Sequence, residues 1–265
     1  MAFMETHYYS PSMSSNIIMN VFIPTPESGE QLTDMNQSEK FDYDNGIPVL
    51  YLLHGGMEDS FVWIQNSNVV RYAQKQGIAL VMASAENSFY HNLKSGKEFE
   101  TFFTEELPLV TRNLFPISRK REHTYIAGTS MGGYGAWYLA LKRPDVFGKA
   151  ASLSGALDIA TMYQFISAGR EDNGQSTWEE AFGNPKELSG SEHDILTLYK
   201  MARESGNVPE LYQTVGTEDF IYPLNVHVKE ELTKLCADFT YEEGPGAHEW
   251  DFWDRQIQRV LEWVK

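Results

Sequence analysis

The chain has 265 residues, of which 42% are hydrophobic and 13% aromatic, so it can bury a large core without disulfides or metals. Its formal net charge of −16 repels phosphate backbones and anionic lipid head groups, which disfavours nucleic acid and membrane surfaces as partners. The single cysteine, Cys236, excludes an internal disulfide and a multi-cysteine zinc site. The N-terminus lacks the basic start and apolar run of a secretory signal, and no apolar run of about 18 residues follows, so we expect a cytoplasmic protein.

The apolar patterns predict an alternation of strands and helices. Period-two or continuous apolar runs predict strands at about 3–9, 15–23, 47–53 and 78–83. The next segments are read as helices near 62–76 and 98–113, a strand at 123–128, a helix at 131–142 and a strand at 147–153. The last part continues with a strand at 210–215, a helix at 224–236, a strand at 238–242 and a helix at 249–264. This order predicts an α/β fold with a mainly parallel sheet and helices on both faces.

Two segments interrupt the alternation. Residues 25–46 are acidic and have no apolar period, so we expect a solvated loop there. Residues 157–205 are too long for a simple connection, and they contain helical patterns at 161–168, 178–182 and 193–202. We expect one domain over 1–265, with 157–205 as a small helical cap over an active site; the alternative is a peripheral decoration without substrate contact.

The segment after the strand at 123–128 predicts a nucleophile. Gly128-Thr129-Ser130-Met131-Gly132 has the G-x-S-x-G pattern between a strand and a helix, which holds a serine on a sharp turn. A Cβ atom at either glycine would clash with the turn or with the adjoining strand. The pattern therefore predicts Ser130 as the nucleophile.

A serine nucleophile needs a base, and the base needs an orienting carboxylate. The strand at 210–215 is followed by Glu218 and Asp219, at the sheet edge where α/β sites form. We predict Asp219 as the acid, with Glu218 as its competitor, because adjacent loop residues point in different directions. The strand at 238–242 is followed by a Gly/Pro loop that contains His248, the predicted base.

The loop after the strand at 47–53 predicts an oxyanion hole. His54-Gly55-Gly56-Met57 has the HGG pattern, which supplies one backbone N–H, and Met131 supplies the second. We predict Gly56 as the donor in the loop, with Met57 left in doubt, and we expect the His54 imidazole to order the loop without taking a proton. An HG pair after a strand can also be only a tight turn. The other histidines are expected at surface or packing positions: His7, His91, His123, His193 and His227.

Four stretches carry a resemblance to a known family: 49–56, 127–136, 216–220 and 246–253. Through them the sequence resembles the esterase D and tributyrin-esterase branch of the α/β-hydrolases, which includes feruloyl esterases, acetylxylan esterases and S-formylglutathione hydrolases. The resemblance implies the α/β-hydrolase fold and a serine carboxylesterase for short acyl groups, with Ser130, Asp219 and His248 as its catalytic triad. It also implies no cofactor, and it makes a homo-oligomer an expectation, because family members are often oligomeric.

The substrate is predicted less sharply. The loop at 55–59 reads Gly-Gly-Met-Glu-Asp, whereas S-formylglutathione hydrolases carry a Gly-Leu-Thr-Cys type of loop, which weakens the thioester interpretation. We expect hydrolysis of small-molecule esters through an acyl-enzyme. The alternatives are a feruloyl or acetylxylan esterase, an S-formylglutathione hydrolase-like thioesterase and an acyltransferase on the same scaffold. A binding protein without chemistry is disfavoured, because all three triad positions are filled.

Aromatic residues flank the predicted loops and either form an apolar acyl pocket or pack in the core. They are Phe61, Trp63, Phe89, Tyr90, Phe220 and Trp250. No His, Asp or Glu cluster has a metal-ligand spacing such as H-E-x-x-H, so we predict no metal site. The acyl length, the leaving group and the oligomeric state do not follow from the sequence.

Overall fold

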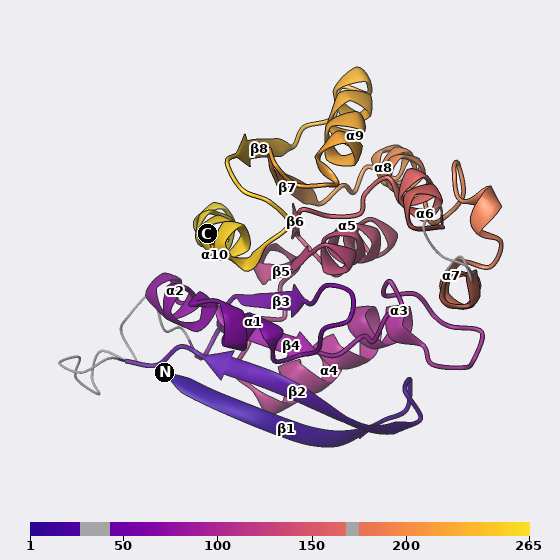
Figure 1. The fold of residues 1–265 in the computed structure, drawn as a ribbon. Helices are drawn as coiled ribbons and strands as arrows, with labels where there is room; N and C mark the ends of the chain where they lie inside the picture. The colour runs from indigo at the N-terminus through magenta and orange to yellow at the C-terminus, as the bar shows by residue number, and fades with distance from the viewer. Residues whose placement is uncertain (27–42, 168–174) are drawn as a thin grey trace.

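The computed structural model of the chain describes residues 1–26, 43–167 and 175–265. In this described part, an eight-stranded sheet has the order β1-β2-β4-β3-β5-β6-β7-β8 (Figure 1). The strands are β1 (Ala2–Ser10), β2 (Ser15–Ile23), β3 (Val49–Leu53), β4 (Ala79–Ala83), β5 (Thr124–Thr129), β6 (Lys149–Leu153), β7 (Glu210–Gly216) and β8 (Thr240–Gly244). Pairing is antiparallel for β1–β2 and β2–β4 and parallel for the rest, so the predicted mainly parallel sheet is confirmed. Most of the acidic segment expected as a loop at 25–46 lies outside the described residues.

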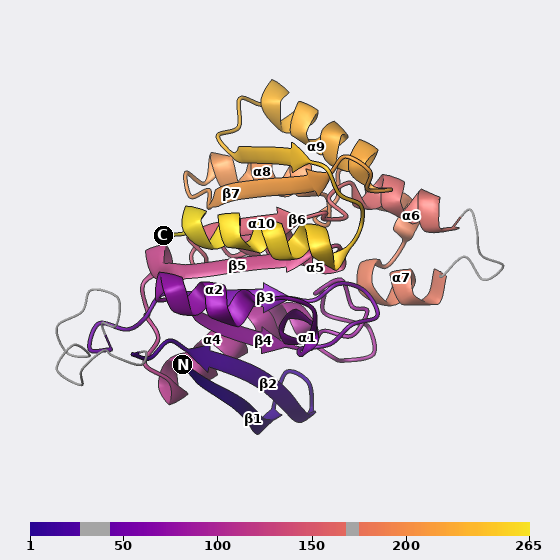
Figure 2. The ribbon, with the colours of Figure 1, turned by 60° about the vertical axis from the view of Figure 1, so that its left-hand side comes forward.

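Helices cover both faces of the sheet, as predicted (Figure 2). One face carries α1 (Val62–Asn66), α2 (Val69–Gln76) and α10 (Trp250–Trp263). The other carries α3 (Phe99–Thr101), a π-helical turn (Phe102–Glu106), α4 (Leu107–Leu114), α5 (Met131–Lys142), α8 (Ile195–Glu204) and α9 (Tyr222–Lys234). Side chains of successive β3 residues point to opposite faces of the sheet. Tyr51 packs on the α5 side, and Leu50 and Leu52 pack on the α10 side. Strands covered on both faces explain the continuous apolar runs in the sequence.

One helix is divided where the sequence predicts continuity. The pattern at 62–76 forms α1 and α2 as separate helices, with Ser67 in an extended backbone conformation between them. The backbone N–H of Asn68 donates to the Asp254 carboxylate of α10 at 2.7 Å. A contact with a helix nearly two hundred residues away thus accompanies the break, and no local pattern carries that information.

The segment 157–205 forms α6 (Ile159–Ser167), α7 (Gln175–Phe182), a 3₁₀ turn (Pro185–Glu187) and α8. Helices α6 and α7 lie beyond the carboxyl ends of the parallel strands (Figure 2). Helix α8 instead packs against α5, within the layer that covers the sheet. His193, placed by the sequence pattern in a helix, lies in the turn before α8, whose N-cap is Asp194. The described part of the chain contains no helix long and apolar enough to cross a membrane.

Candidate active site

Ser130 occupies a sharp turn between β5 and α5. Its backbone has φ +53° and ψ −117°, a conformation that an L-residue adopts only at a cost of about 1–3 kcal/mol. A Cβ atom at Gly128 would lie 2.4 Å from the carbonyl oxygen of Gly132, and one at Gly132 would lie 2.6 Å from the carbonyl oxygen of His54. The glycines therefore allow the strand, the turn and the neighbouring loop to approach closely enough to present Ser130.

A hydrogen-bonded relay joins Ser130 to the two predicted partners. The Oγ atom of Ser130 lies 3.0 Å from His248 Nε2, and His248 Nδ1 lies 2.9 and 3.0 Å from the two carboxylate oxygens of Asp219. Carboxylate oxygens accept hydrogen bonds, so His248 donates through Nδ1–H and its Nε2 accepts the Ser130 hydroxyl. The side chain of Asp219 is fully buried, and its Oδ1 also accepts the N–H of Ile221 at 3.1 Å.

The two acids after β7 point in different directions. Asp219 contacts His248, whereas the exposed Glu218 turns away and accepts the N–H of Gly246 in the loop after β8. Backbone contacts tie the same two loops together: Thr217 donates to Gly244 at 2.9 Å and Glu218 donates to Gly246 at 3.0 Å. These contacts place the loop that carries Asp219 next to the loop that carries His248.

Two aromatic rings flank the His248 imidazole. The Trp253 ring of α10 is buried and lies edge-on at 4.9 Å, with its indole N–H donating to Ser154 Oγ at 3.1 Å. The Phe220 ring lies at 4.6 Å and is 49% exposed. One aromatic neighbour of the imidazole is therefore packed in the core, and the other keeps a large part of its surface in contact with solvent.

His54 orders the loop after β3. The N–H of Ala85 donates to His54 Nε2 at 2.7 Å, so this nitrogen carries no proton, and Nδ1–H donates to the Gly55 carbonyl at 2.7 Å. Burial lowers the pKa of His54, which keeps the imidazole neutral. These contacts agree with the expectation that His54 orders the loop and takes no proton.

The backbone N–H groups of the predicted oxyanion donors differ in their hydrogen-bond partners. The N–H of Met57 donates to Asn87 Oδ1 at 2.7 Å, so in this conformation it is already used. No described residue accepts the N–H of Gly56. Met131 is the first residue of α5, where an N–H has no partner within its own helix. Among the described residues, the N–H groups of Gly56 and Met131 thus have no acceptor, and Asn87 is a supporting residue that the sequence did not reveal.

Glu58 is a second residue that the sequence did not reveal. Its carboxylate accepts the N–H of Gly55 at 2.7 Å and also bonds the Trp250 side chain. Burial raises the pKa of Glu58, while the attraction of His248 acts in the opposite direction. An acidic group therefore lies inside the loop and within electrostatic reach of the histidine.

The predicted pocket aromatics fall into two groups. Trp63 and Tyr90 are fully buried and bond backbone carbonyls, of Leu53 at 3.0 Å and of His54 at 2.9 Å, so they support the loops from behind and are not open pocket surface. Phe61 and Phe220 are exposed on loops, and Trp250 is half-buried between Trp63 and Trp253. The half-buried Phe89 ring packs against Trp178 and Phe182 of α7, at 4.6 and 5.2 Å.

A buried polar cluster lies behind the site, between α5 and the segment 157–205. The Tyr134 hydroxyl donates to the His193 carbonyl at 2.8 Å, so the contact of 3.0 Å between His91 Nε2 and the same hydroxyl has His91 as the donor. Burial lowers the pKa of His91 well below its usual value, with the nearby His193 and Lys142 acting in the same direction. His91 is thus a neutral packing residue.

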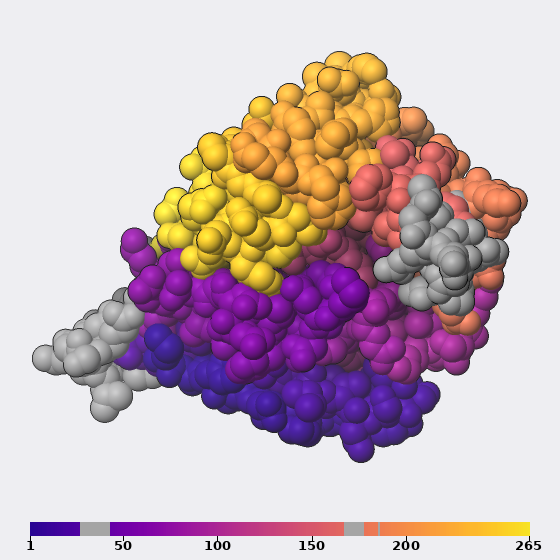
Figure 3. Space-filling view, viewed as in Figure 1, coloured from indigo at the N-terminus to yellow at the C-terminus, as the bar shows by residue number. Residues whose placement is uncertain are grey.

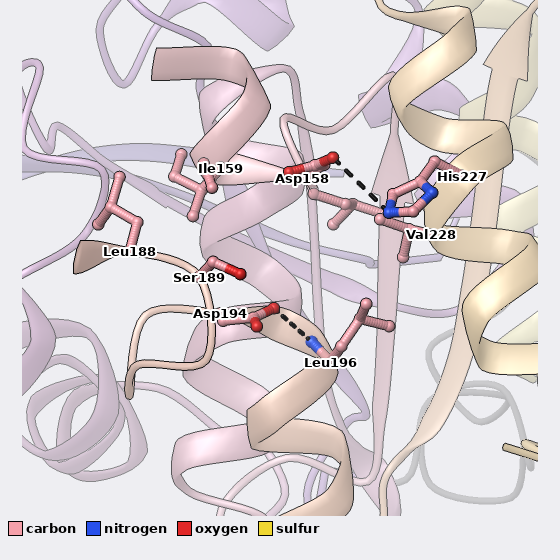
Figure 4. A pocket seen from close by; sticks show the side chains of 10 residues that line it. Asp158, Ile159, Leu188, Ser189, Asp194, Leu196, His227 and Val228 are labelled. Carbon is pink, nitrogen blue, oxygen red and sulfur yellow. Dashed lines mark hydrogen bonds and ion pairs between the residues drawn. The ribbon is translucent and has the colours of Figure 1, made fainter. Parts of the chain in front are cut away.

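Two hollows lie away from the relay. A cavity of about 70 Å³ beneath α6 is bordered by Asp158, Ser189, Asp194 and His227, among others, and Asp158 lies 3.9 Å from His227 (Figure 4). An open groove of about 470 Å³ follows the seam between α2 and α10, where the purple and yellow segments meet in Figure 3. Neither contains Ser130 or His248. Among the described residues, no group of three or more His, Cys, Asp or Glu side chains is placed to hold a metal ion.

Comparison with known proteins places this geometry in a family. The sequence profile of the Esterase family matches residues 37–264. The chain is 33% identical over 267 residues to the acetyl esterase of Caldicellulosiruptor saccharolyticus, covering 100% of this chain and 98% of that protein.

Solved structures agree with the family assignment. FphF, a fluorophosphonate-binding serine hydrolase of Staphylococcus aureus, matches with a TM-score of 0.85 at 27% identity, covering 99% of this chain and 98% of its own. The S-formylglutathione hydrolase FrmB of the same organism matches with a TM-score of 0.82 at 28% identity, again covering 99% and 98%. The chain therefore belongs to the Esterase family and is a serine hydrolase with the α/β-hydrolase fold.

Proposed function

We propose that this chain hydrolyses short-chain carboxylic esters through an acyl-enzyme on Ser130, with His248 as the base and Asp219 as its orienting acid. The observation that carries the proposal is the continuous relay from Ser130 Oγ through His248 to Asp219, with successive contacts of 3.0 and 2.9 Å. Its geometry meets the requirement that nucleophile, base and orienting group lie within hydrogen-bond reach of each other.

The reaction has two steps. His248 Nε2 takes the Ser130 proton as Oγ attacks the ester carbonyl, and it then gives that proton to the leaving alcohol oxygen as the carbon–oxygen bond breaks. Water enters next, donates a proton to His248 and attacks the acyl carbon. The bond between that carbon and Ser130 Oγ then breaks and His248 returns the proton to Oγ, which releases the acid and restores Ser130. Asp219 keeps Nδ1 protonated, so that Nε2 is the nitrogen that exchanges the proton throughout.

The developing oxyanion is assigned to the N–H groups of Gly56 and Met131. Both belong to segments held in place before substrate binds, by the His54 contacts on one side and by α5 on the other. Met57 is the weaker candidate, because its N–H is bonded to Asn87. Removal of one preorganised donor of this kind typically lowers kcat by about 10²- to 10³-fold.

The preference for short acyl groups is supported by the similarity to an acetyl esterase over the whole chain. The net charge of −16 adds a weak, salt-screened bias against anionic esters. A small neutral ester is therefore the substrate class that we propose.

The test compares wild type with Ser130→Ala on a p-nitrophenyl series from acetate to dodecanoate, with methyl ferulate and a thioester beside it. We expect wild type to be fastest at the short acyl chains and Ser130→Ala to lose about 10⁶ in kcat with an unchanged circular dichroism spectrum. Ser189→Ala, an exposed serine beside the cavity under α6, is the matched control and should retain wild-type rates. Activity that survives Ser130→Ala would contradict the proposal.

The acid is tested separately. Asp219→Asn removes the negative charge and replaces one carboxylate oxygen by an NH₂ donor, so the side chain no longer enforces the tautomer with Nδ1 protonated. This should lower kcat by about 10⁴, whereas Glu218→Gln should change it only a few-fold. The reverse order of effects would assign the acid to Glu218.

A further inference from the structure

The proposed reaction places the leaving group beside His248. The nitrogen that receives the Ser130 proton must deliver it to the leaving alcohol oxygen, so this oxygen lies within hydrogen-bond reach of His248 Nε2. A substituent on that oxygen therefore extends along a flank of the imidazole. The Trp253 flank is closed, because that ring is 5% exposed and packs in the core with α10.

The open flank carries an aromatic surface. The Phe220 ring lies 4.6 Å from the imidazole, and the Phe165 ring of α6 lies nearly parallel to it, with a centroid distance of 6.0 Å and an interplanar angle of 18°. Phe165 is 60% exposed and Phe220 is 49% exposed, so both rings keep apolar surface in contact with solvent. We call these two rings the aromatic ledge.

The ledge joins two parts of the chain that are distant in sequence. Phe220 follows the acid Asp219 in the loop after β7, and Phe165 projects from the segment 157–205. Exposed aromatic side chains that border a reactive group form a surface on which a flat apolar group can stack, at the ring separations of about 4.5–7 Å that aromatic pairs prefer. The place of the ledge beside His248, the group that protonates the leaving oxygen, assigns it to the alcohol side of the ester.

We propose that Phe165 and Phe220 form the binding surface for the alcohol portion of the substrate and give the enzyme a preference for esters of aromatic alcohols. This inference rests on the proposed function, because it uses His248 as the group that protonates the leaving oxygen. It gives the segment 157–205 a direct contact with substrate through Phe165.

The experiment separates the two sides of the ester. The kcat/KM of each enzyme is measured on benzyl acetate and ethyl acetate, which share an acyl group, and on methyl phenylacetate and methyl acetate, which share an alcohol. Phe165→Ala is the main variant, because Phe165 contacts Phe220 and not His248. Phe165→Tyr retains a ring, and Tyr9→Ala on β1, which removes a 61% exposed aromatic at the edge of the sheet, is the matched control.

We expect Phe165→Ala to lower the ratio of kcat/KM for benzyl acetate to kcat/KM for ethyl acetate about three- to tenfold, because the variant loses one aromatic contact with the benzyl group. The ratio for the two methyl esters should stay within about twofold, and Phe165→Tyr and Tyr9→Ala should behave as wild type. An equal loss on all four esters would show a structural role and overturn the inference, as would a loss confined to methyl phenylacetate. A wild type that hydrolyses no ester overturns the proposed function, and this inference with it, before any variant is compared.

Discussion

The backbone N–H of Met57 donates a hydrogen bond of 2.7 Å to the side-chain oxygen of Asn87. The contact joins the loop after β3 to the loop after β4, across thirty positions of the chain. Met57 has φ +65° and its side chain is 88% exposed, so packing does not hold this backbone conformation. Asn87 therefore holds the turn that follows Gly56, the loop residue that we propose as an oxyanion donor.

Asn87→Ala removes this support. We expect kcat on p-nitrophenyl acetate to fall about tenfold, because a small displacement of a positioned group costs one to two orders of magnitude in rate. Asn92→Ala, in the same connection but bonded to Thr101, is the control and should retain wild-type kcat. Unchanged kinetics in Asn87→Ala would show that the Met57 contact does not position the oxyanion donors.

Glu58→Gln separates charge from hydrogen bonding. The glutamine oxygen still accepts the Gly55 N–H, but the negative charge near His248 is lost. That charge stabilises the imidazolium that forms as His248 takes the Ser130 proton, so its removal should lower kcat on p-nitrophenyl acetate about threefold.

The Glu58 effect requires the carboxylate to be ionised. Burial raises the pKa of Glu58, so in wild type the charge is present above that raised pKa and is lost as the pH falls through it. Glu86→Gln, which removes an exposed carboxylate paired with Lys97, is the control. An unchanged or higher kcat of Glu58→Gln at pH 8 would contradict the prediction.

His91 makes stability depend on pH. Its pKa is lowered well below the usual value in the folded chain, so below about pH 6.5 the unfolded chain binds a proton that the folded chain excludes. Protonation of His91 therefore does not reduce the free energy of unfolding above about pH 6.5. As the pH falls below that value, the free energy of unfolding decreases by at most about 1.4 kcal/mol per pH unit for this one group.

His91→Phe should flatten this dependence when the free energy of unfolding is measured by urea titration between pH 7 and 5. The Tyr134 hydroxyl keeps its acceptor, the carbonyl of His193, so the cluster retains that bond. His54 and His193 also have lowered pKa values, so a residual slope is expected. His7→Gln, an exposed histidine on β1, is the control, and a slope unchanged by His91→Phe would show that His91 is not responsible.

Gly132→Ala tests the close approach of the backbone at the turn that carries Ser130. The added Cβ atom would lie 2.6 and 2.7 Å from the backbone carbonyl oxygens of His54 and Leu53, which belong to the sheet and its loop and cannot move freely. We expect a loss of about 3 kcal/mol in the free energy of unfolding, measured as a lower urea midpoint. Gly244→Ala, where no atom lies within 4 Å of the added Cβ, should leave the midpoint nearly unchanged. Equal effects of the two substitutions would exclude the crowding argument.

Local patterns were sufficient for most of the fold. The helix at 131–142 and the strand at 15–23 have the predicted bounds, and the other strands begin and end within about two residues of the prediction. These elements are set by apolar periodicity, which is a property of neighbouring residues. The G-x-S-x-G pattern identified the turn at Ser130 for the same reason, because the need for glycine arises within a few residues of the serine.

Contacts between distant segments decided the side-chain orientations at the candidate site and the break in one predicted helix. The orientation of Asp219 toward His248, and of Glu218 away from it, depends on how the loops after β7 and β8 bond to each other. The break between α1 and α2 accompanies a bond to α10, and Trp63 and Tyr90 were candidates for an open pocket until packing placed them behind the loops.

The amino-acid sequence by itself thus determined the order of the elements, the turn at Ser130 and the loops that carry the acid and the histidine, because each is specified by residues adjacent along the chain. Only the tertiary structure decided which acid contacts the histidine, that Asn87 engages Met57, and that Phe165 stacks on Phe220 beside His248. Side-chain directions in loops are set by partners that packing brings from elsewhere in the chain, and no periodicity in the sequence encodes those partners.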